Sequence, residues 1–90
     1  MPRYYFHVDD GDDEQPDTEG VELSGLAAAR VQAATAVGEL LRDRPEAFWN
    51  ARDWSLKVED EAGLVLFSIL VSAVAALALS LTSLSGAGAA

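Results

Sequence analysis

The fold of this chain is decided by the stretch WSLKVEDEAGLVLFSIL, residues 54–70. Residues 54–59 alternate apolar and polar side chains, a pattern typical of a strand that is covered on one face only. The segment DEAG at 60–63 has the length and the glycine of a hairpin loop. The stretch therefore predicts a β-hairpin with strands at 54–59 and 64–70.

The second strand of this hairpin differs from the first, because apolar side chains fall on both of its faces. Alternation places on one face Leu66, Ser68 and Leu70, and on the other face Val65, Phe67 and Ile69. Such a strand requires burial on both sides. The change coincides with a boundary in charge, since all 15 acidic and 6 basic side chains lie at or before Glu61. Residues 62–90 carry no charge. One part of the chain must stay hydrated, and the other requires cover from the domain itself, a second subunit or a bilayer.

Before the hairpin, residues 3–9 predict a first strand, because aromatic and β-branched side chains favour a pleated surface. Its alternation puts on one face Tyr4, Phe6 and Val8, and on the other face Tyr5 and His7. Residues 9–17 are rich in turn formers and predict a solvated loop. Residues 20–23 predict a short strand that pairs back against the first.

The main helix is expected to start at Ser24, a residue type whose side-chain oxygen caps helix N-termini. Apolar residues then recur at steps of three and four, at Leu26, Ala29, Ala33, Ala36, Val37, Leu40 and Leu41. Pro45 stops this pattern, because its ring clashes with a continuing helix. The helix is therefore expected to end near Asp43, with one further short turn within residues 46–52.

The last part of the chain predicts a second helix over residues 72–84, because large apolar side chains recur there at helical spacing. The final residues 85–90 have little that can pack and are expected to be disordered. The chain thus divides into a domain at residues 1–70 and an apolar tail at residues 71–90.

The predicted fold class is α+β: a small ββαββ antiparallel sheet with one main helix packed on one face, plus an apolar C-terminal strand and helix tail. A chain of 90 residues forms one small domain and leaves much of its surface wet unless something covers it. One helix covers one face of a sheet, so we expect a second, open face that carries Tyr5, His7 and one side of the last hairpin.

Composition excludes several function classes. A net charge of −9 argues against nucleic-acid binding, which requires clustered Lys and Arg for phosphate neutralisation. The absence of cysteine removes disulfides, thiolate nucleophiles and thiolate zinc sites. No apolar signal segment precedes the first acidic residues, which favours a cytoplasmic location.

Catalytic and metal-binding constellations are also missing from the sequence pattern. His7 is the single histidine, and a lone strand histidine is usually structural. The acidic run at residues 9–22 lacks the spacing of a calcium loop, since no glycine or closing glutamate falls where such a loop needs them. We therefore expect no enzymatic activity, no cofactor and no metal site.

Several short motifs occur here in combination: PRYYFHV at 2–8, DG at 10–11, DTEGVEL at 17–23, AAR at 28–30 and the segment 54–63. In these motifs the chain resembles a family of short alphaproteobacterial proteins that is a domain of unknown function. The resemblance covers residues 2 to about 68 and implies a ββαββ-type domain. It implies no activity, cofactor or catalytic residue. The chain departs from the family at residues 69–90, where members usually have a short polar segment.

Together these observations favour a non-enzymatic interaction module that associates with itself or with another protein through the tail and the sheet. Symmetric dimers are the commonest way to cover such surface. The candidate interaction surface comprises Tyr5, His7, Phe67, Ile69, Val74, Leu77 and Leu81.

Two other functions remain open. Residues 64–84 are uncharged and long enough to cross a bilayer as a helix, which would tether the acidic part of the protein to the inner membrane. Against this, no Lys or Arg flanks the segment, and too few residues remain to span if 64–70 is a strand. Alternatively, the acidic charge suits a decoy that occupies the binding site of a basic partner.

Overall fold

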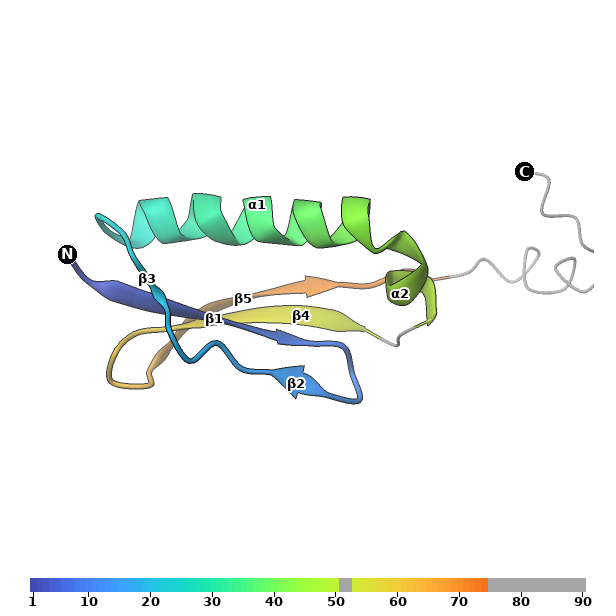
Figure 1. The fold of residues 1–90 in the computed structure, drawn as a ribbon, viewed down its shortest axis with the longest axis horizontal. Helices are drawn as coiled ribbons and strands as arrows, with labels where there is room; N and C mark the ends of the chain where they lie inside the picture. The colour runs from blue at the N-terminus through green and yellow to red at the C-terminus, as the bar shows by residue number, and fades with distance from the viewer. Residues whose placement is uncertain (51–52, 75–90) are drawn as a thin grey trace, which may run out of the picture.

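Helix α1 (Leu26–Asp43) lies across one face of an antiparallel β-sheet (Figure 1). The computed structural model describes residues 1–50 and 53–74. The strands are β1 (Arg3–Asp9), β2 (Glu14–Gln15), β3 (Val21–Glu22), β4 (Trp54–Glu59) and β5 (Val65–Val71), and a short helix α2 (Pro45–Asn50) follows α1. The predicted α+β class, with one main helix on one face of an antiparallel sheet, is confirmed.

The sheet has the order β2-β1-β4-β5, and β3 also pairs with β1. Strands β1 and β4 are central, with His7 opposite Lys57 and Val8 opposite Leu56. The chain reaches β4 only after crossing the sheet as α1 and α2, so β1 and β4 are neighbours although they are far apart in sequence. On one side the sheet ends in two short strands, and on the other it ends in β5.

Strand β2 forms where the sequence predicts only a loop, which corrects that prediction. The carboxylates of the turn itself organise the chain: Gly11 N–H donates to Asp9 Oδ1 at 2.7 Å, and Asp13 N–H donates to Asp10 Oδ1 at 2.8 Å. These bonds close the turn and bring Gln15 opposite Val8. Turn-forming residues can therefore also continue a strand pair, which composition alone does not reveal.

The core lies between α1 and the sheet and follows the alternation of β4, whose Trp54, Leu56 and Val58 are buried. Ala29 and Ala33 of α1 are also fully buried, because small side chains let the helix approach the strands closely. Further apolar side chains pack around this cluster, from β1 Phe6 and Val8, from α1 Ala36 and Val37, and from β5 Leu66, Phe67 and Ile69.

The start of α1 lies one residue later than predicted. Gly25 occupies the N-cap position with an extended backbone and no side-chain cap, and its carbonyl accepts the Ala29 N–H at 3.0 Å. The prediction of Ser24 as the cap is therefore wrong: the chain stays extended for one more residue after leaving β3. The predicted end at Asp43 is confirmed, and Pro45 begins α2, where a missing N–H costs nothing.

A β-bulge interrupts the pairing of β4 with β5. Val58 lies opposite Phe67, but Glu59 lies opposite Val65, so Leu66 is an additional residue on β5. Both Leu66 and Phe67 pack against the core under α1. Simple alternation groups Leu66 with Ser68 and Leu70 on one face, and the bulge overturns that prediction.

The chain after β5 is described only to Val74, and residues 72–74 are not helical. Most of the predicted helix at 72–84, and all of the predicted disordered end at 85–90, lie outside the described residues. The first part of the alternative membrane segment 64–84 is strand β5. Within residues 1–50 and 53–74, no helix has the length and apolarity needed to cross a membrane.

Candidate interaction surface

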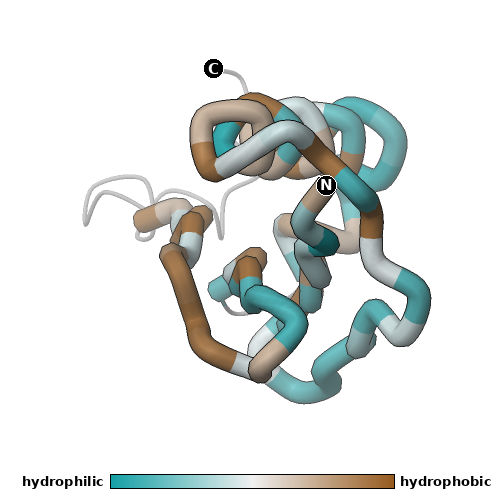
Figure 2. The backbone as a smooth tube through the Cα atoms, turned by 90° about the vertical axis from the view of Figure 1, so that its left-hand side faces the viewer, coloured by the Kyte–Doolittle hydropathy of each residue, from teal (hydrophilic) through white to brown (hydrophobic). Residues whose placement is uncertain are grey.

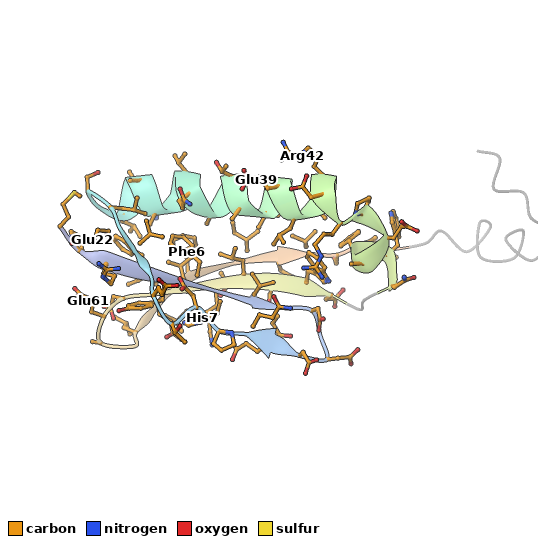
Figure 3. All side chains as sticks on the ribbon, in the orientation of Figure 1. Phe6, His7, Glu22, Glu39, Arg42 and Glu61 are labelled. Atoms are coloured by element: carbon orange, nitrogen blue, oxygen red, sulfur yellow. The ribbon has the colours of Figure 1, made fainter. Side chains whose placement is uncertain are left out.

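In the part of the chain that the structure describes, no helix covers the face of the sheet opposite α1, which we call the open face; it carries Tyr5 and His7, as predicted. Figure 3 shows Phe6 pointing from β1 toward α1, and His7, the next residue, on the opposite side of the sheet. The register extends this open face across β4 and β5, because Tyr5 lies opposite Glu59, His7 opposite Lys57, and Lys57 opposite Ser68. Near β1 and β4 the open face is therefore polar.

A short segment of chain, residues 16–20, is fixed against β1, and we call it the strap. Its anchor is Asp17, whose Oδ2 accepts the Phe6 N–H at 3.1 Å and whose Oδ1 accepts the N–H groups of Glu19 at 3.1 Å and Gly20 at 3.0 Å. Gly20 has a φ of 73°, and a Cβ there would lie 2.9 Å from the Tyr4 carbonyl oxygen. The close approach of strap and strand thus requires glycine.

The bonds to Asp17 also act on its charge. Burial of the carboxyl group raises its pKa, but hydrogen bonds from the backbone N–H groups of Gly20, Phe6 and Glu19 outweigh this effect and leave the pKa of Asp17 below its ordinary value. The strap is consequently held best when Asp17 is ionised.

His7 is the second anchor of the strap. The Asp17 N–H donates to His7 Nδ1 at 3.0 Å, so in the neutral ring the proton lies on Nε2, which faces Glu59 Oε1 at 3.2 Å. The imidazole is largely covered, with 13% of its side chain exposed. Both ring nitrogens are therefore engaged in joining β1, β4 and the strap, which supports a structural role.

The polar network continues through Lys57, whose Nζ lies 3.5 Å from Glu59 Oε2 and 3.4 Å from Glu14 Oε2 of β2. The charge of Glu14 and a hydrogen bond with it raise the pKa of Lys57, so this ammonium group stays charged. Partly exposed ion pairs of this kind contribute little stability individually. Their effect is to hold the short strand β2 in place beside β1.

The polar groups of this site are engaged with one another. Its histidine and its carboxylates are engaged by hydrogen bonds and ion pairs within the sheet, and the lysine beside them, Lys57, is itself paired with Glu14 and Glu59. Among residues 1–50 and 53–74, no group of three or more His, Asp or Glu side chains is arranged to hold a metal ion. The site supports the cohesion of the sheet.

A groove of about 380 Å³ lies between the last turns of α1 and the sheet. Its apolar lining comes from Phe6, Val8, Ala36, Leu40 and Leu56, and its charged lining from Glu39, Asp43 and Arg44. All of these charged residues belong to the end of α1 and the residue after it. The groove therefore lacks polar groups converging from several elements, which usually fix the orientation of a bound small molecule.

The β5 side of the sheet presents a different surface, which is apolar. Four exposed large apolar side chains lie along β5 and at its ends, at Leu64, Val65, Leu70 and Val74. Leu70 is 68% exposed and Val74 91% exposed. Figure 2 shows hydrophobic chain along one side of the sheet and hydrophilic chain along the other. Within the described residues β5 pairs only with β4, so its outer edge is open.

The structure separates the residues predicted for the interaction surface. Tyr5 and His7 lie on the open face, whereas Phe67 and Ile69 lie on the face under α1 and pack against the core. Val74 lies just beyond β5 and is exposed. Two further candidates lie outside the described residues, namely Leu77 and Leu81.

Three exposed residues of the β5 side are absent from the predicted set: Leu64, Val65 and Leu70. The alternation of the sequence already places Leu70 on the same face as Ser68. The bulge at Leu66 decides that this is the face away from α1. A bulge leaves little trace in the sequence, so the exposed side of β5 follows from the register and not from the pattern.

The fold and its surfaces define a small α+β domain with one polar side, closed by the strap, and one apolar side that the described residues leave uncovered. By sequence, the chain belongs to the family described as Domain of unknown function (DUF6894), whose model matches residues 3–72. The predicted membership in a family of unknown function is thereby confirmed. The match includes every strand of the sheet, β5 among them. No curated protein and no solved structure matches the chain.

Proposed function

We propose that this domain is a non-enzymatic self-association module whose copies meet along the β5 side of the sheet. One observation carries the proposal: the outermost strand on this side is seven residues long, uncharged and flanked by exposed apolar side chains. Apolar surface of this kind gains about 25 cal/mol for each Å² that is removed from water. Association of two copies along this side removes the apolar surface from water.

The distribution of charge supports the same side. Two copies with a net charge of −9 each repel one another, but screening at physiological salt limits this repulsion to about 8 Å. Residues 62–74, which include β5, are uncharged. An approach along β5 therefore keeps most carboxylates of the two copies apart, whereas an approach along β2 and β3 brings Glu14 and Glu22 together.

The polar side chains of the open face are already engaged within the domain. His7 and Asp17 hold the strap, and Lys57 holds β2, so these groups are engaged in closing one edge of the sheet. Binding along the β5 side, which the described residues leave uncovered, does not need these polar groups. The function proposed here thus rests on the side of the molecule that its own described residues leave uncovered.

The test is the mass of the full chain in solution, measured by sedimentation equilibrium. We expect a mass of twice 9.5 kDa for the natural chain. Leu70→Lys and Val31→Lys form a matched pair, because both side chains are 68% exposed and both changes raise the net charge by one. A lysine is what natural proteins place on edge strands to prevent pairing.

We expect Leu70→Lys to weaken the dimer and Val31→Lys, on the outer surface of α1, to leave it unchanged. A natural chain that remains monomeric up to about 100 μM, a concentration at which even a weak specific complex is populated, would refute the proposed function.

A further inference from the structure

The two edges of the sheet are built differently. Strands β2 and β3 have two residues each, carry Glu14 and Glu22, and are tied down by ion pairs with Lys57 and Arg3. Strand β5 is seven residues long with the sequence VLFSILV and contains neither charge nor proline. Proteins usually protect an edge strand by keeping it short or by placing charged residues or proline on it, because its unpaired N–H and C=O groups pair with other strands. Strand β5 lacks these features.

The direction of these N–H and C=O groups follows from the register. Phe6 donates its N–H to Asp17 and thus faces away from β4, so its partner Val58 faces away from β1 and toward β5. The Asp60 N–H, two residues on, donates to the Leu64 carbonyl and shows the same direction. Val58 therefore bonds to its partner Phe67 on β5.

Alternation along β5 then determines the direction in which the backbone groups of its other residues point. Phe67, Ile69 and Val71 direct their backbone groups toward β4, whereas Ser68 and Leu70 direct theirs outward. The side chains of Ser68 and Leu70 also lie on the open face, where both are exposed. The outer edge of β5 thus presents backbone donors and acceptors beside an exposed leucine, and the partner that matches them is a strand.

Charge decides the orientation of that strand when the partner is a second copy. A parallel arrangement places the two acidic hairpin loops, which contain Asp60 and Glu61, next to each other. An antiparallel arrangement centred on Ile69 places the two Glu61 residues roughly 30 Å apart, because Glu61 lies five residues beyond Leu56, the partner of Ile69, at about 3.3 Å per residue. The bulge at Leu66 limits regular pairing to residues 67–71, of which Ile69 is the centre.

We infer that β5 pairs antiparallel with β5 of a second copy about a two-fold axis at Ile69, which joins the two sheets into one continuous sheet. Ser68 then exchanges hydrogen bonds with Leu70 of the partner subunit, and Leu70 with Ser68 of the partner subunit. This inference rests on the proposed function and specifies how the two copies meet.

The first test compares Ser68→Pro with Ser68→Thr in the full chain. Proline removes the outward N–H and obstructs a neighbouring strand, and an edge strand tolerates it where its N–H faces outward. Threonine keeps the N–H. We expect Ser68→Pro to weaken the dimer on the order of a hundredfold, because the two-fold axis repeats each lost bond, and Ser68→Thr to leave it unchanged.

The second test uses the absence of cysteine from the natural chain and does not depend on the proline variant. Residue 69 meets its own copy across the axis as a non-hydrogen-bonded pair with Cα atoms about 4.5 Å apart, a separation that a disulfide can bridge. Residue 71 lies on the same face but about 13 Å from its copy. We expect mild oxidation to cross-link Ile69→Cys and not Val71→Cys.

Equal cross-linking of the two cysteine variants, or a dimer that Ser68→Pro leaves intact, would overturn this pairing while the proposed self-association stands. A monomeric natural chain would instead overturn the proposed function itself. Outward amides of β5 that are protected from exchange in a dilute monomer would show that another segment of the same chain covers the edge, and would also overturn the pairing.

Discussion

The two edges of this sheet differ in how their outward backbone N–H and C=O groups are covered. At the β1 edge, the chain covers its own backbone groups with β2, β3 and the carboxylate of Asp17. At the β5 edge, no described residue does so, and the strand is longer and uncharged. Acidic residues therefore do more here than keep the protein hydrated, since several serve as fixed hydrogen-bond acceptors that close one edge of the sheet.

The largest effect on this contrast is expected from Gly20→Ala, which acts on the strapped edge. The residue has a positive φ of 73°, and an added Cβ lies 2.9 Å from Arg3 Cγ, the Tyr4 carbonyl oxygen and a Tyr5 ring carbon. We expect a loss of about 2–4 kcal/mol in the free energy of unfolding, from the strained backbone and the displaced strap together. Urea denaturation measures it.

Gly63→Ala is the matched control for this variant. Gly63 also has a positive φ, of 81°, but nothing lies within 4 Å of the added Cβ. We expect it to cost only the backbone term, about 1 kcal/mol. Equal losses for the two variants would show that the strap does not lie close against β1.

A smaller effect is expected from Asp17→Ala, which removes the acceptor of three backbone N–H groups. These groups are partly covered, so leaving them without a partner is expected to cost about 1–3 kcal/mol at pH 7. Asp12→Ala is the control, because the Asp12 carboxylate is exposed and accepts no hydrogen bond within the described chain. If both variants unfold at the same urea concentration, Asp17 does not anchor the strap.

The smallest expected effect is on how the free energy of unfolding depends on pH. The pKa of Asp17 lies below its ordinary value in the folded state, so its contribution to stability is complete above the pKa of the unfolded chain and is lost as the pH falls through the folded value. Partial exposure limits this contribution to less than about 1 kcal/mol. We expect Asp17→Ala to lose less stability than the natural chain between pH 5 and pH 2.

A natural chain and an Asp17→Ala variant with parallel pH profiles would show that other carboxylates carry the acid sensitivity. Asp10 provides an internal reference, since hydrogen bonds from the N–H groups of Asp13 and Asp12 lower its pKa and do not involve Asp17. Its effect is therefore common to the two profiles and cancels in the comparison.

The strands and the main helix could be predicted because each has a strong periodic signal. The alternation of residues 54–59 gave β4 with both ends correct, and Pro45 located the end of α1. Strand β2 could not be predicted, because it depends on turn geometry set by Asp9 and Asp10. The bulge at Leu66 was equally invisible, since one additional residue changes the register without changing the composition.

The candidate surface was predictable only in part, for the same reason. Tyr5 and His7 were correctly placed on the open face, because β1 is regular. Phe67 and Ile69 lie under α1, since the bulge at Leu66 determines which residues of β5 face the core. The role of His7 as an anchor of the strap depends on Asp17, ten residues away in sequence, and no local pattern connects the two.

The contrast between the two edges is tested most directly by amide hydrogen exchange of the natural chain at two protein concentrations. At low concentration we predict slow exchange for the Phe6 N–H, which Asp17 accepts, and fast exchange for Ser68 and Leu70. At high concentration we predict that Ser68 and Leu70 also become slow. Slow exchange of Ser68 and Leu70 at both concentrations, or fast exchange of Phe6, would contradict the account.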